Sequence, residues 1–441
     1  MKQFVSDRRL RTARVISKRW QRRAIFLMGG IAVGAAAVAL ATLSDWAQFA
    51  LAALLAKWRY ASLMVTPLGF ALSVFLTNRF FRNSQGSGIP QAIAARQLSD
   101  QTARGKLVSI RIAIGKILLT LLGLLCGASV GREGPTVQVG ASIMFAIGRM
   151  SPRRQPGLIL AGSAAGVAAA FNTPLAGIVF GIEEMSRAYE TRTSGLIIAA
   201  VIAAGLTSLA LVGNYDYFGS SSTMLRNGTD WLAVPLCGVV GGLAGGLFSR
   251  LVIEMSRSFS GRLWPAIKGY PVSFAFACGL AVALCGIASG DMIYGTGYAQ
   301  VKAALESGTP LPFDFAPLKL VATAFSTISG LPGGIFAPSL AVGAGIGSNI
   351  AQLFSHAPLG AMMLLGMVAY FAGVVQAPIT AFAIVTEMSD NHAMVVPLMA
   401  AALIAHATSG LVCPEGIYHA LAKGFLNQAA PAVEAAKPVS G

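Results

Sequence analysis

Two stretches of this chain place carboxylates among apolar residues. Glu133 lies in GREGPTVQVGASI (131–143), with apolar runs on both sides, and Glu184 lies in IEEMS (182–186) at the end of another apolar segment. A carboxylate is costly to keep charged in such a setting, so it usually takes up and releases a proton or binds a partner. An intramembrane carboxylate is by default a candidate for a proton relay, and what each of these two can do depends on the elements around it.

Composition places the chain in a membrane. Of its 441 residues, 55% are hydrophobic and 11% are charged, and the mean hydropathy is +0.67, whereas a soluble domain carries about 25% charged residues. Backbone groups in lipid must be hydrogen-bonded internally, so we predict an all-α integral membrane protein. The 50 glycines and 20 prolines favour short or broken helices. Apolar segments of about twenty residues, long enough to cross a bilayer, recur at 24–43, 60–78, 107–130, 194–213, 232–249, 271–289 and 391–411.

The net charge of +16 reflects membrane topology rather than nucleic-acid binding. Nine of the 33 basic residues lie in 1–23, directly before the first apolar segment. Basic residues favour the cytoplasmic side, so we predict a basic cytoplasmic N-terminal segment at 1–23, which could also lie on anionic lipid as a surface helix. Basic connections at 149–154 and 250–268 are predicted to be cytoplasmic as well, and the loop 214–230, nearly free of basic residues, is predicted to be external.

The chain contains an internal repeat. GREGPTVQVGASI aligns with GIFAPSLAVGAGI (334–346) at an offset of 203 residues, and NTPLAGIVFGIEEMS (172–186) resembles QAPITAFAIVTEMS (376–389). The two halves have opposite charge bias, because no Lys or Arg occurs between 320 and 422. Opposite bias predicts an inverted repeat, an architecture that places a binding site at mid-membrane where broken helices meet.

Three glycine-rich turns share one design. Each has proline where the first turn of a helix should lie, and proline there loses no hydrogen bond. The glycines let the backbone approach a ligand closely, and the free N–H groups and positive dipole of each helix start would face that ligand. An anion is the natural ligand; the alternative is that these are ordinary capped helix starts. The turns are GSGIP (86–90), GREGP (131–135) and GIFAP (334–338), with motif residues Gly86, Gly88, Pro90, Gly131, Arg132, Gly134, Pro135, Gly334 and Pro338.

The three turns, in this order and followed by a C-terminal tyrosine, resemble the CLC family of chloride channels and chloride/proton antiporters, in its prokaryotic type without CBS domains. The resemblance implies an inverted repeat of tilted and broken transmembrane helices, a homodimer with one pore per subunit, and location in the plasma membrane, the inner membrane of a bacterium. The implied division is a transport domain at 24–425, with halves at roughly 24–215 and 230–411 and a C-terminal helix at 415–425, followed by a tail at 426–441.

The resemblance also implies roles for individual residues. Ser87 and Tyr418, the latter in PEGIYHALAKGF, supply hydroxyl groups to a central chloride, and backbone N–H groups near Ile335 and Phe336 complete its coordination. Glu133 is the gating glutamate: its charged carboxylate occupies an anion position, and its protonated form leaves that position and swings outward. Competition between this carboxylate and chloride would couple protons to anions.

Three further charged residues complete the predicted ion path. Glu184 matches the internal proton acceptor of the family's antiporters; the alternative is an interfacial charge that, together with Glu183, pairs with Arg187. Arg132 would add positive potential at the outer entrance. Lys116 would raise the potential along the inner pathway, unless its side chain snorkels to the interface.

Three other polar residues complete the interpretation. Glu387 and Asp390 are expected to be external cap or packing residues. Gln91 is a departure from the family pattern, because it follows GSGIP where many relatives have an acid.

These observations predict secondary active exchange of chloride for protons, with no enzyme activity, cofactor or metal. The presence of Glu184 favours exchange, since channels of the family commonly lack a carboxylate there. One alternative is a passive, voltage- or pH-gated chloride channel of the same family. The fluoride-selective branch is disfavoured by Ser87 and Tyr418. An intramembrane enzyme using Glu133, Glu184 and His406 is a third possibility, but the sequence offers no nucleophile–base or metal-ligand cluster for it.

Overall fold

The structure, a computed structural model, describes residues 2–150, 152–186, 191–213, 218, 223–225, 228–257, 269–354 and 357–434. Throughout these residues the regular structure is helical, apart from two isolated β-type bridges. The prediction of an all-α chain with repeated apolar spans is confirmed. Seven helices in the described part are long and apolar enough to cross a membrane: Arg23–Lys57, Ser62–Phe80, Gln101–Leu125, Gly195–Val212, Asp230–Arg257, Pro271–Ala288 and His392–Val412.

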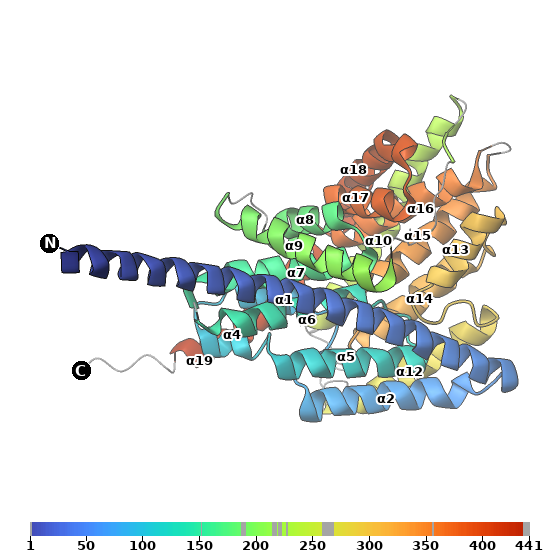
Figure 1. Cartoon of the computed structure of the whole chain (residues 1–441). Helices are drawn as coiled ribbons and strands as arrows, with labels where there is room; N and C mark the ends of the chain where they lie inside the picture. The colour runs from blue at the N-terminus through green and yellow to red at the C-terminus, as the bar shows by residue number, and fades with distance from the viewer. Residues whose placement is uncertain are drawn as a thin grey trace.

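The first helix, α1 (Lys2–Lys57), is longer than the sequence indicated. It continues past residue 43, the predicted end of the first span, and crosses the length of the molecule (Figure 1). It contains no proline, and small residues let it approach its neighbours closely: a Cβ on Gly34 would lie 2.6 Å from the carbonyl oxygen of Ala204 in α9 (Thr191–Val212). The basic segment predicted as separate is therefore continuous with the first span.

The other helices form two sets along the chain. The first set is α2 (Ser62–Phe80), α3 (Ile89–Gln97), α4 (Gln101–Gly105), α5 (Ile110–Leu125), α6 (Glu133–Ile147), α7 (Gln155–Phe171), α8 (Pro174–Phe180) with the π-helical turn η3 (Gly181–Ser186), and α9. The second set is α10 (Ala233–Arg257), α12 (Pro271–Ala288), α13 (Tyr298–Ser307), α14 (Phe315–Ile328), α15 (Phe336–Ala351), α16 (Leu359–Val375), α17 (Pro378–Ser389) and α18 (Val395–Val412).

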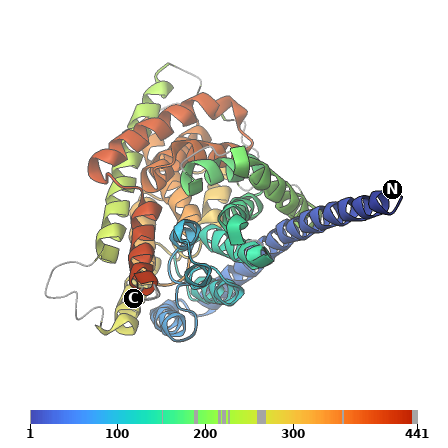
Figure 2. The same ribbon diagram turned by 90° about the vertical axis from the view of Figure 1, so that its left-hand side faces the viewer.

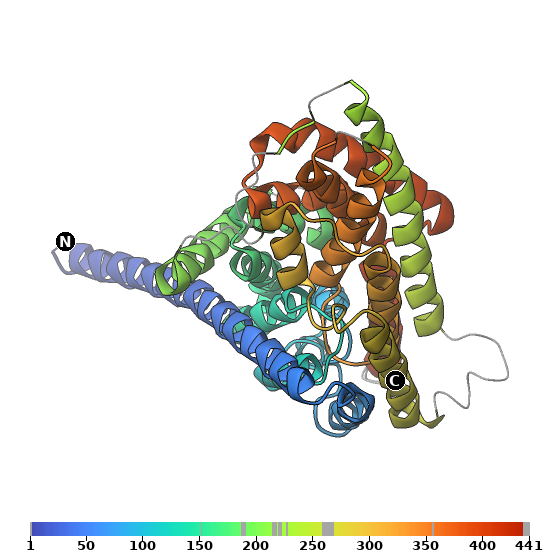
Figure 3. The ribbon, with the colours of Figure 1, turned by 90° about the vertical axis from the view of Figure 1, so that its right-hand side faces the viewer.

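The two sets of helices pack against each other. Helix α12 of the second set packs along α2 of the first, and the two lie side by side in Figures 1 and 3. The C-terminal helix α19 (Ile417–Glu434) packs against α3, and Figure 2 shows it, in red, on the face turned to the viewer. It extends past residue 425, where the predicted C-terminal helix ended.

The predicted repeat is visible in the packing of the backbone. Helices α6 and α7 cross where a Cβ on Gly140 would lie 2.2 Å from the carbonyl oxygen of Gly162. Helices α15 and α16 cross in the same way, because a Cβ on Gly343 would lie 2.4 Å from the carbonyl oxygen of Gly366. Both crossings require glycine, and they occupy matching places in the two sets.

A reciprocal pair of caps shows that the repeat is inverted. Glu183 accepts hydrogen bonds from two first-turn N–H groups of α17, at 3.0 and 2.6 Å, and Glu387 accepts two from the first turn of α8, also at 3.0 and 2.6 Å. Each glutamate lies late in its own segment and caps the start of the other, so the two segments run antiparallel. Carboxylates stabilise helix starts, and Glu387 is confirmed as a cap. Asp390 ends α17 at its C-cap, with a φ of +46°.

Glu387→Ala tests this cap. Two first-turn N–H groups of α8 would lose their charged acceptor, so we expect a loss of about 1–2 kcal/mol in stability. The measurement is the midpoint of thermal unfolding in detergent. Glu254→Ala is the control, because Glu254 forms an exposed i,i+4 pair with Arg250 and should change stability by less than about 0.5 kcal/mol. Equal midpoints for the two variants would contradict the reciprocal capping.

Candidate anion site at the helix starts

The three glycine-rich turns meet in the interior. Gly131 and Gly334 exchange backbone hydrogen bonds in both directions, each at 2.7 Å. Gly86 donates to the carbonyl oxygen of Leu331 at 3.2 Å and accepts from the N–H of Gly333 at 3.0 Å. These bonds join segments far apart in the sequence, so the starts of α3, α6 and α15 are adjacent.

Glycine is required at two of these positions. Gly88, the N-cap of α3, has a φ of +96°, a conformation that residues with a Cβ rarely adopt. A Cβ on Gly134 would lie 2.3 Å from the hydroxyl oxygen of Ser87 and 3.2 Å from the Cα of Gly334, so it would push the turns apart. The predicted helix starts are confirmed, with a proline in each first turn: Pro90, Pro135 and Pro338.

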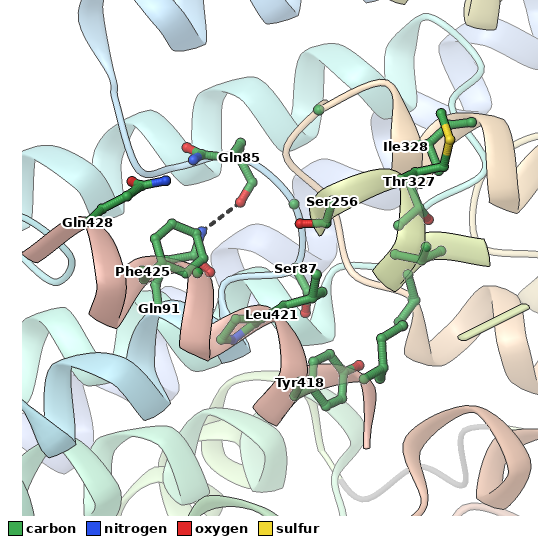
Figure 4. A pocket seen from close by; sticks show the side chains of 18 residues that line it. Gln85, Ser87, Gln91, Ser256, Thr327, Ile328, Tyr418, Leu421, Phe425 and Gln428 are labelled. Atoms are coloured by element: carbon green, nitrogen blue, oxygen red, sulfur yellow. Dashed lines mark hydrogen bonds between the residues drawn. The ribbon is translucent and has the colours of Figure 1, made fainter. Parts of the chain in front are cut away.

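Ser87 and Tyr418 line one cavity of about 270 Å³ (Figure 4). Ser87 comes from the turn before α3 and Tyr418 from the first turn of α19, and Ile335 at the start of α15 lines the same cavity. Both side chains are buried; their two hydroxyls lie close enough to interact with each other, but neither forms a regular hydrogen bond with any described residue. Buried hydroxyls normally have partners, so these two are suited to donate to a ligand.

Phe336 is the first residue of α15, and its side chain is fully buried in an aromatic cluster. Its ring centroid lies 4.8 Å from that of Phe371, 5.9 Å from Tyr418, 6.0 Å from Phe180 and 6.2 Å from Phe171. The ring anchors the start of α15 through apolar contacts. The backbone N–H of Phe336, rather than its side chain, is thus the group that can face an anion.

Glu133 is the first residue of α6, and its side chain is fully buried. Its carboxylate lies next to Gly131: a Cβ added to that glycine would be 2.2 Å from one carboxylate oxygen. Neither carboxylate oxygen forms a regular hydrogen bond with a described residue; the nearby groups that favour its negative charge are the guanidinium of Arg132 and the backbone N–H groups of Glu133 and Ala337. Because Ala337 belongs to the first turn of α15, the carboxylate lies between two helix starts, where an anion is favoured.

Arg132 forms hydrogen bonds that connect the start of α6 to α1. Its guanidinium, 5% exposed, donates to the carbonyl oxygen of Ala41 at 2.7 Å and to the carboxylate of Asp45 at 2.8 Å, both on α1. The ion pair with Asp45, which is 60% exposed, partly cancels the positive charge that the sequence assigns to the outer entrance.

Lys116 supports the turn before Ser87. Its side chain is fully buried, and its ammonium donates to the carbonyl oxygens of Ser84 at 2.6 Å and Gly86 at 2.7 Å. The snorkelling alternative for this residue is therefore wrong, because the side chain ends inside the protein, bonded to two carbonyl oxygens.

The structure contains a second loop of the same construction, which was not predicted from the sequence. Lys319 is fully buried, lies 203 residues after Lys116, and donates to two loop carbonyl oxygens at 2.7 Å each. Its loop, GTG at 295–297, has glycine φ angles of +65° and +80°, against +63° and +96° in GSG. The backbone N–H and the hydroxyl of Thr296 both donate to the side-chain oxygen of Gln48, at 3.0 and 3.2 Å. The two loops are 209 residues apart, whereas the motifs that reveal the repeat are 203 residues apart, so the loops do not align at the offset of the repeat.

Glu184 lies in η3, and its side chain is 3% exposed. The Nε2 atom of His419 lies 2.8 Å from the backbone carbonyl oxygen of Glu184 and 3.6 Å from its carboxylate. Arg187, the partner in the interfacial interpretation, lies outside the described residues. Burial of the carboxylate fits a proton acceptor better than an exposed interfacial charge. His419 was not predicted from the sequence, where its only signal is its place beside Tyr418.

The fold and the site define a multi-pass membrane protein in which broken helices from two inverted repeats meet at a buried carboxylate. Residues 69–410 match the family described as voltage gated chloride channel. The chain belongs to this family, the CLC family that its three turns resemble.

Two relatives are H(+)/Cl(-) exchange transporters named ClcA. The one from Yersinia pseudotuberculosis serotype IB (strain PB1/+) is 31% identical over 423 residues, which cover 89% of this chain and 85% of the relative. The one from Salmonella arizonae is 30% identical over 429 residues, covering 89% and 87%.

Two solved structures have the same fold. The chain resembles a slow cyanobacterial Cl-/H+ antiporter with a TM-score of 0.76 and 26% identity, covering 92% of this chain and 98% of the other. It resembles a CLC-type fluoride/proton antiporter with a TM-score of 0.75 and 22% identity, covering 90% and 96%. The predicted CLC-type fold is confirmed.

Gly134→Ala tests how closely the turns meet. The added Cβ would lie 2.8 Å from the backbone oxygen of Ser87, so the backbones must separate, and we expect a loss of about 1–3 kcal/mol in stability. The measurement is again the thermal midpoint in detergent. Gly424→Ala is the matched control, because Gly424 lines the same cavity but has no atom within 4 Å of an added Cβ. A midpoint of Gly134→Ala equal to that of this control would refute the close approach.

Proposed function

We propose that this protein exchanges chloride for protons across a membrane. The observation that carries the proposal is the buried Glu133 carboxylate between the starts of α6 and α15, next to the turn that holds Ser87. The names of the two relatives and of the cyanobacterial antiporter support exchange over passive conduction.

Chloride would bind where the hydroxyls of Ser87 and Tyr418 meet the N–H groups of Ile335 and Phe336. The first N–H groups of a helix have no intrahelical partner, and the two hydroxyls, which lie close to each other, form no regular hydrogen bond with any described residue. These donors are neutral, so they can strip water from a halide without holding it too tightly to release. Lys116, behind the turn, adds positive potential on the inner side.

Glu133 would act as the gate. When charged, its carboxylate holds the anion position between two helix starts. When protonated, it has no charge for those dipoles to hold, so chloride can displace it and the side chain can swing outward. One position shared by a carboxylate and a halide thus links each proton taken up to an anion that passes.

Glu184 would accept protons on the inner side. It is buried in η3, and an intramembrane carboxylate is a default candidate for a proton relay. Proton and chloride would then share the outer part of the path at Glu133 and separate on the inner side, where chloride passes Ser87.

We also propose the setting in which the exchanger works. The basic residues of α1 favour a cytoplasmic N-terminus in a bacterial inner membrane, with lipid around the apolar helices. A homodimer with one pore per subunit follows from the resemblance to the family.

Transport by purified protein in liposomes tests the proposal. With an imposed chloride gradient, we expect protons to move against their own gradient, driven by chloride, and a pH electrode measures them. Chloride flux without proton movement would favour the passive channel instead. Failure to move any anion would rule out both.

Glu133→Gln should keep chloride flux but lose proton movement. Glutamine resembles the protonated side chain and cannot carry a proton, so we expect chloride-driven proton flux to fall at least about a hundredfold, measured in the same liposomes. Glu254→Gln, on the exposed face of α10, is the control and should exchange normally. Uphill proton pumping by Glu133→Gln would remove this residue from the gate.

Glu184→Gln should also stop proton movement while chloride continues to flow. The inner side would lose its acceptor, and the measured ratio of protons to chloride should fall at least about tenfold. Glu306→Gln, an exposed glutamate on α13, should leave the ratio unchanged. A normal ratio in Glu184→Gln would return Glu184 to a structural role.

A further inference from the structure

The turn before Ser87 has every carbonyl oxygen of residues 83–86 bonded to a side chain. The side-chain nitrogen of Lys116 donates hydrogen bonds to the carbonyl oxygens of Ser84 and Gly86. The side-chain amide of Gln138 donates to the carbonyl oxygen of Asn83 at 3.0 Å. The N–H of a peptide unit points opposite to its C=O, so fixing these oxygens also fixes where the N–H groups of the turn point.

Gln91 completes this set and is the member that faces the cavity. Its side-chain Nε2 donates to the carbonyl oxygen of Gln85 at 2.7 Å, drawn as a dashed line in Figure 4, and to that of Asn83 at 3.3 Å. Gln91 is 1% exposed and lies at the third position of α3. Glutamate at this position of a helix normally accepts an N–H from the N-cap, whereas here the side chain has to donate.

The cavity beside Gln91 carries no formal charge. None of the described residues that line it is Asp, Glu, Lys or Arg, and its polar groups are the amides and hydroxyls seen in Figure 4. Charge interactions weaken little over short distances when the surroundings exclude water. A single negative charge at Gln91 would therefore act strongly on an anion beside Ser87.

We propose that Gln91 is a positioning residue for the anion site, and that its neutral, donating amide sets how tightly the cavity holds a halide. It acts through the turn, by holding the carbonyl oxygens of Asn83 and Gln85 away from the anion, and through its lack of charge. This proposal rests on the proposed binding of chloride at Ser87.

The test compares Gln91→Glu with Gln91→Met. Glutamate has nearly the same shape but carries a charge and cannot donate when ionised; protonated, it is neutral and can donate one hydrogen bond. Methionine removes the donor without adding charge. Both are made in a Glu133→Gln background, so that the gate itself does not titrate.

Bromide affinity of the purified proteins is measured by calorimetry at about pH 9.5 and at about pH 4.5, on either side of the range in which a buried glutamate takes up its proton. Relative to the background protein at each pH, Gln91→Glu should bind at least about tenfold more weakly at the higher pH and recover to within about threefold at the lower. Gln91→Met should bind about three- to tenfold more weakly at both.

Gln428→Glu is the matched control, because Gln428 lines the same cavity but is exposed. A charge there is screened by solvent, and affinity should change by less than about threefold. Thermal midpoints of all variants separate unfolding from weaker binding, because a purely structural role for Gln91 would lower the midpoint without a pH-dependent change in affinity.

Three outcomes would overturn the proposal. Affinity equal to that of the background protein in both Gln91 variants would show that the amide has no effect on the anion. Equal, pH-independent losses in Gln91→Glu and Gln91→Met would show that charge at this position does not reach the site. Lack of bromide binding by the background protein itself would instead refute chloride binding at Ser87, and this proposal with it.

Discussion

A backbone that binds an anion inside a membrane must present N–H groups while it satisfies its own carbonyl oxygens elsewhere. This constraint governs the turn before Ser87, where Lys116, Gln138 and Gln91 take up four consecutive carbonyl oxygens. An unbonded carbonyl there would both cost free energy in lipid and repel a halide. The buried Lys116 is therefore best understood as a support for the turn, with its side-chain nitrogen bonded to two carbonyl oxygens.

A loop supported by a buried lysine occurs in both halves of the inverted repeat, but the two loops have different neighbours. Lys319 supports the GTG loop by hydrogen bonds to carbonyl oxygens, as Lys116 supports the GSG turn. Thr296 in GTG donates to Gln48 of α1, whereas Ser87 in GSG lines a cavity. The difference is made by what packs against each loop, α1 in one case and the start of α19 in the other. In the proposed mechanism one half thus provides the anion site and the other a closed structural copy, so that a symmetric fold would give a single path.

Much of the fold followed from local patterns. The seven apolar spans, the helix starts at the three proline-containing turns and the repeat were predictable, because hydropathy, proline and glycine act within a few residues of where they stand. The end of α1, the extension of α19 and the second loop were not. Composition does not mark where a continuous apolar helix leaves the bilayer, and the two loops differ in spacing from the motifs that reveal the repeat.

The sequence by itself determined that this chain is an all-helical membrane protein with broken helices whose starts suit an anion. Only the tertiary structure decided that Glu133 is buried between two of those starts, that Lys116 is bonded within the protein, and that Ser87 and Tyr418 share a cavity. The reason is physical: spans and turns depend on neighbours along the chain, whereas burial and donor–acceptor pairing depend on residues far apart in sequence that meet only when the two repeats pack together.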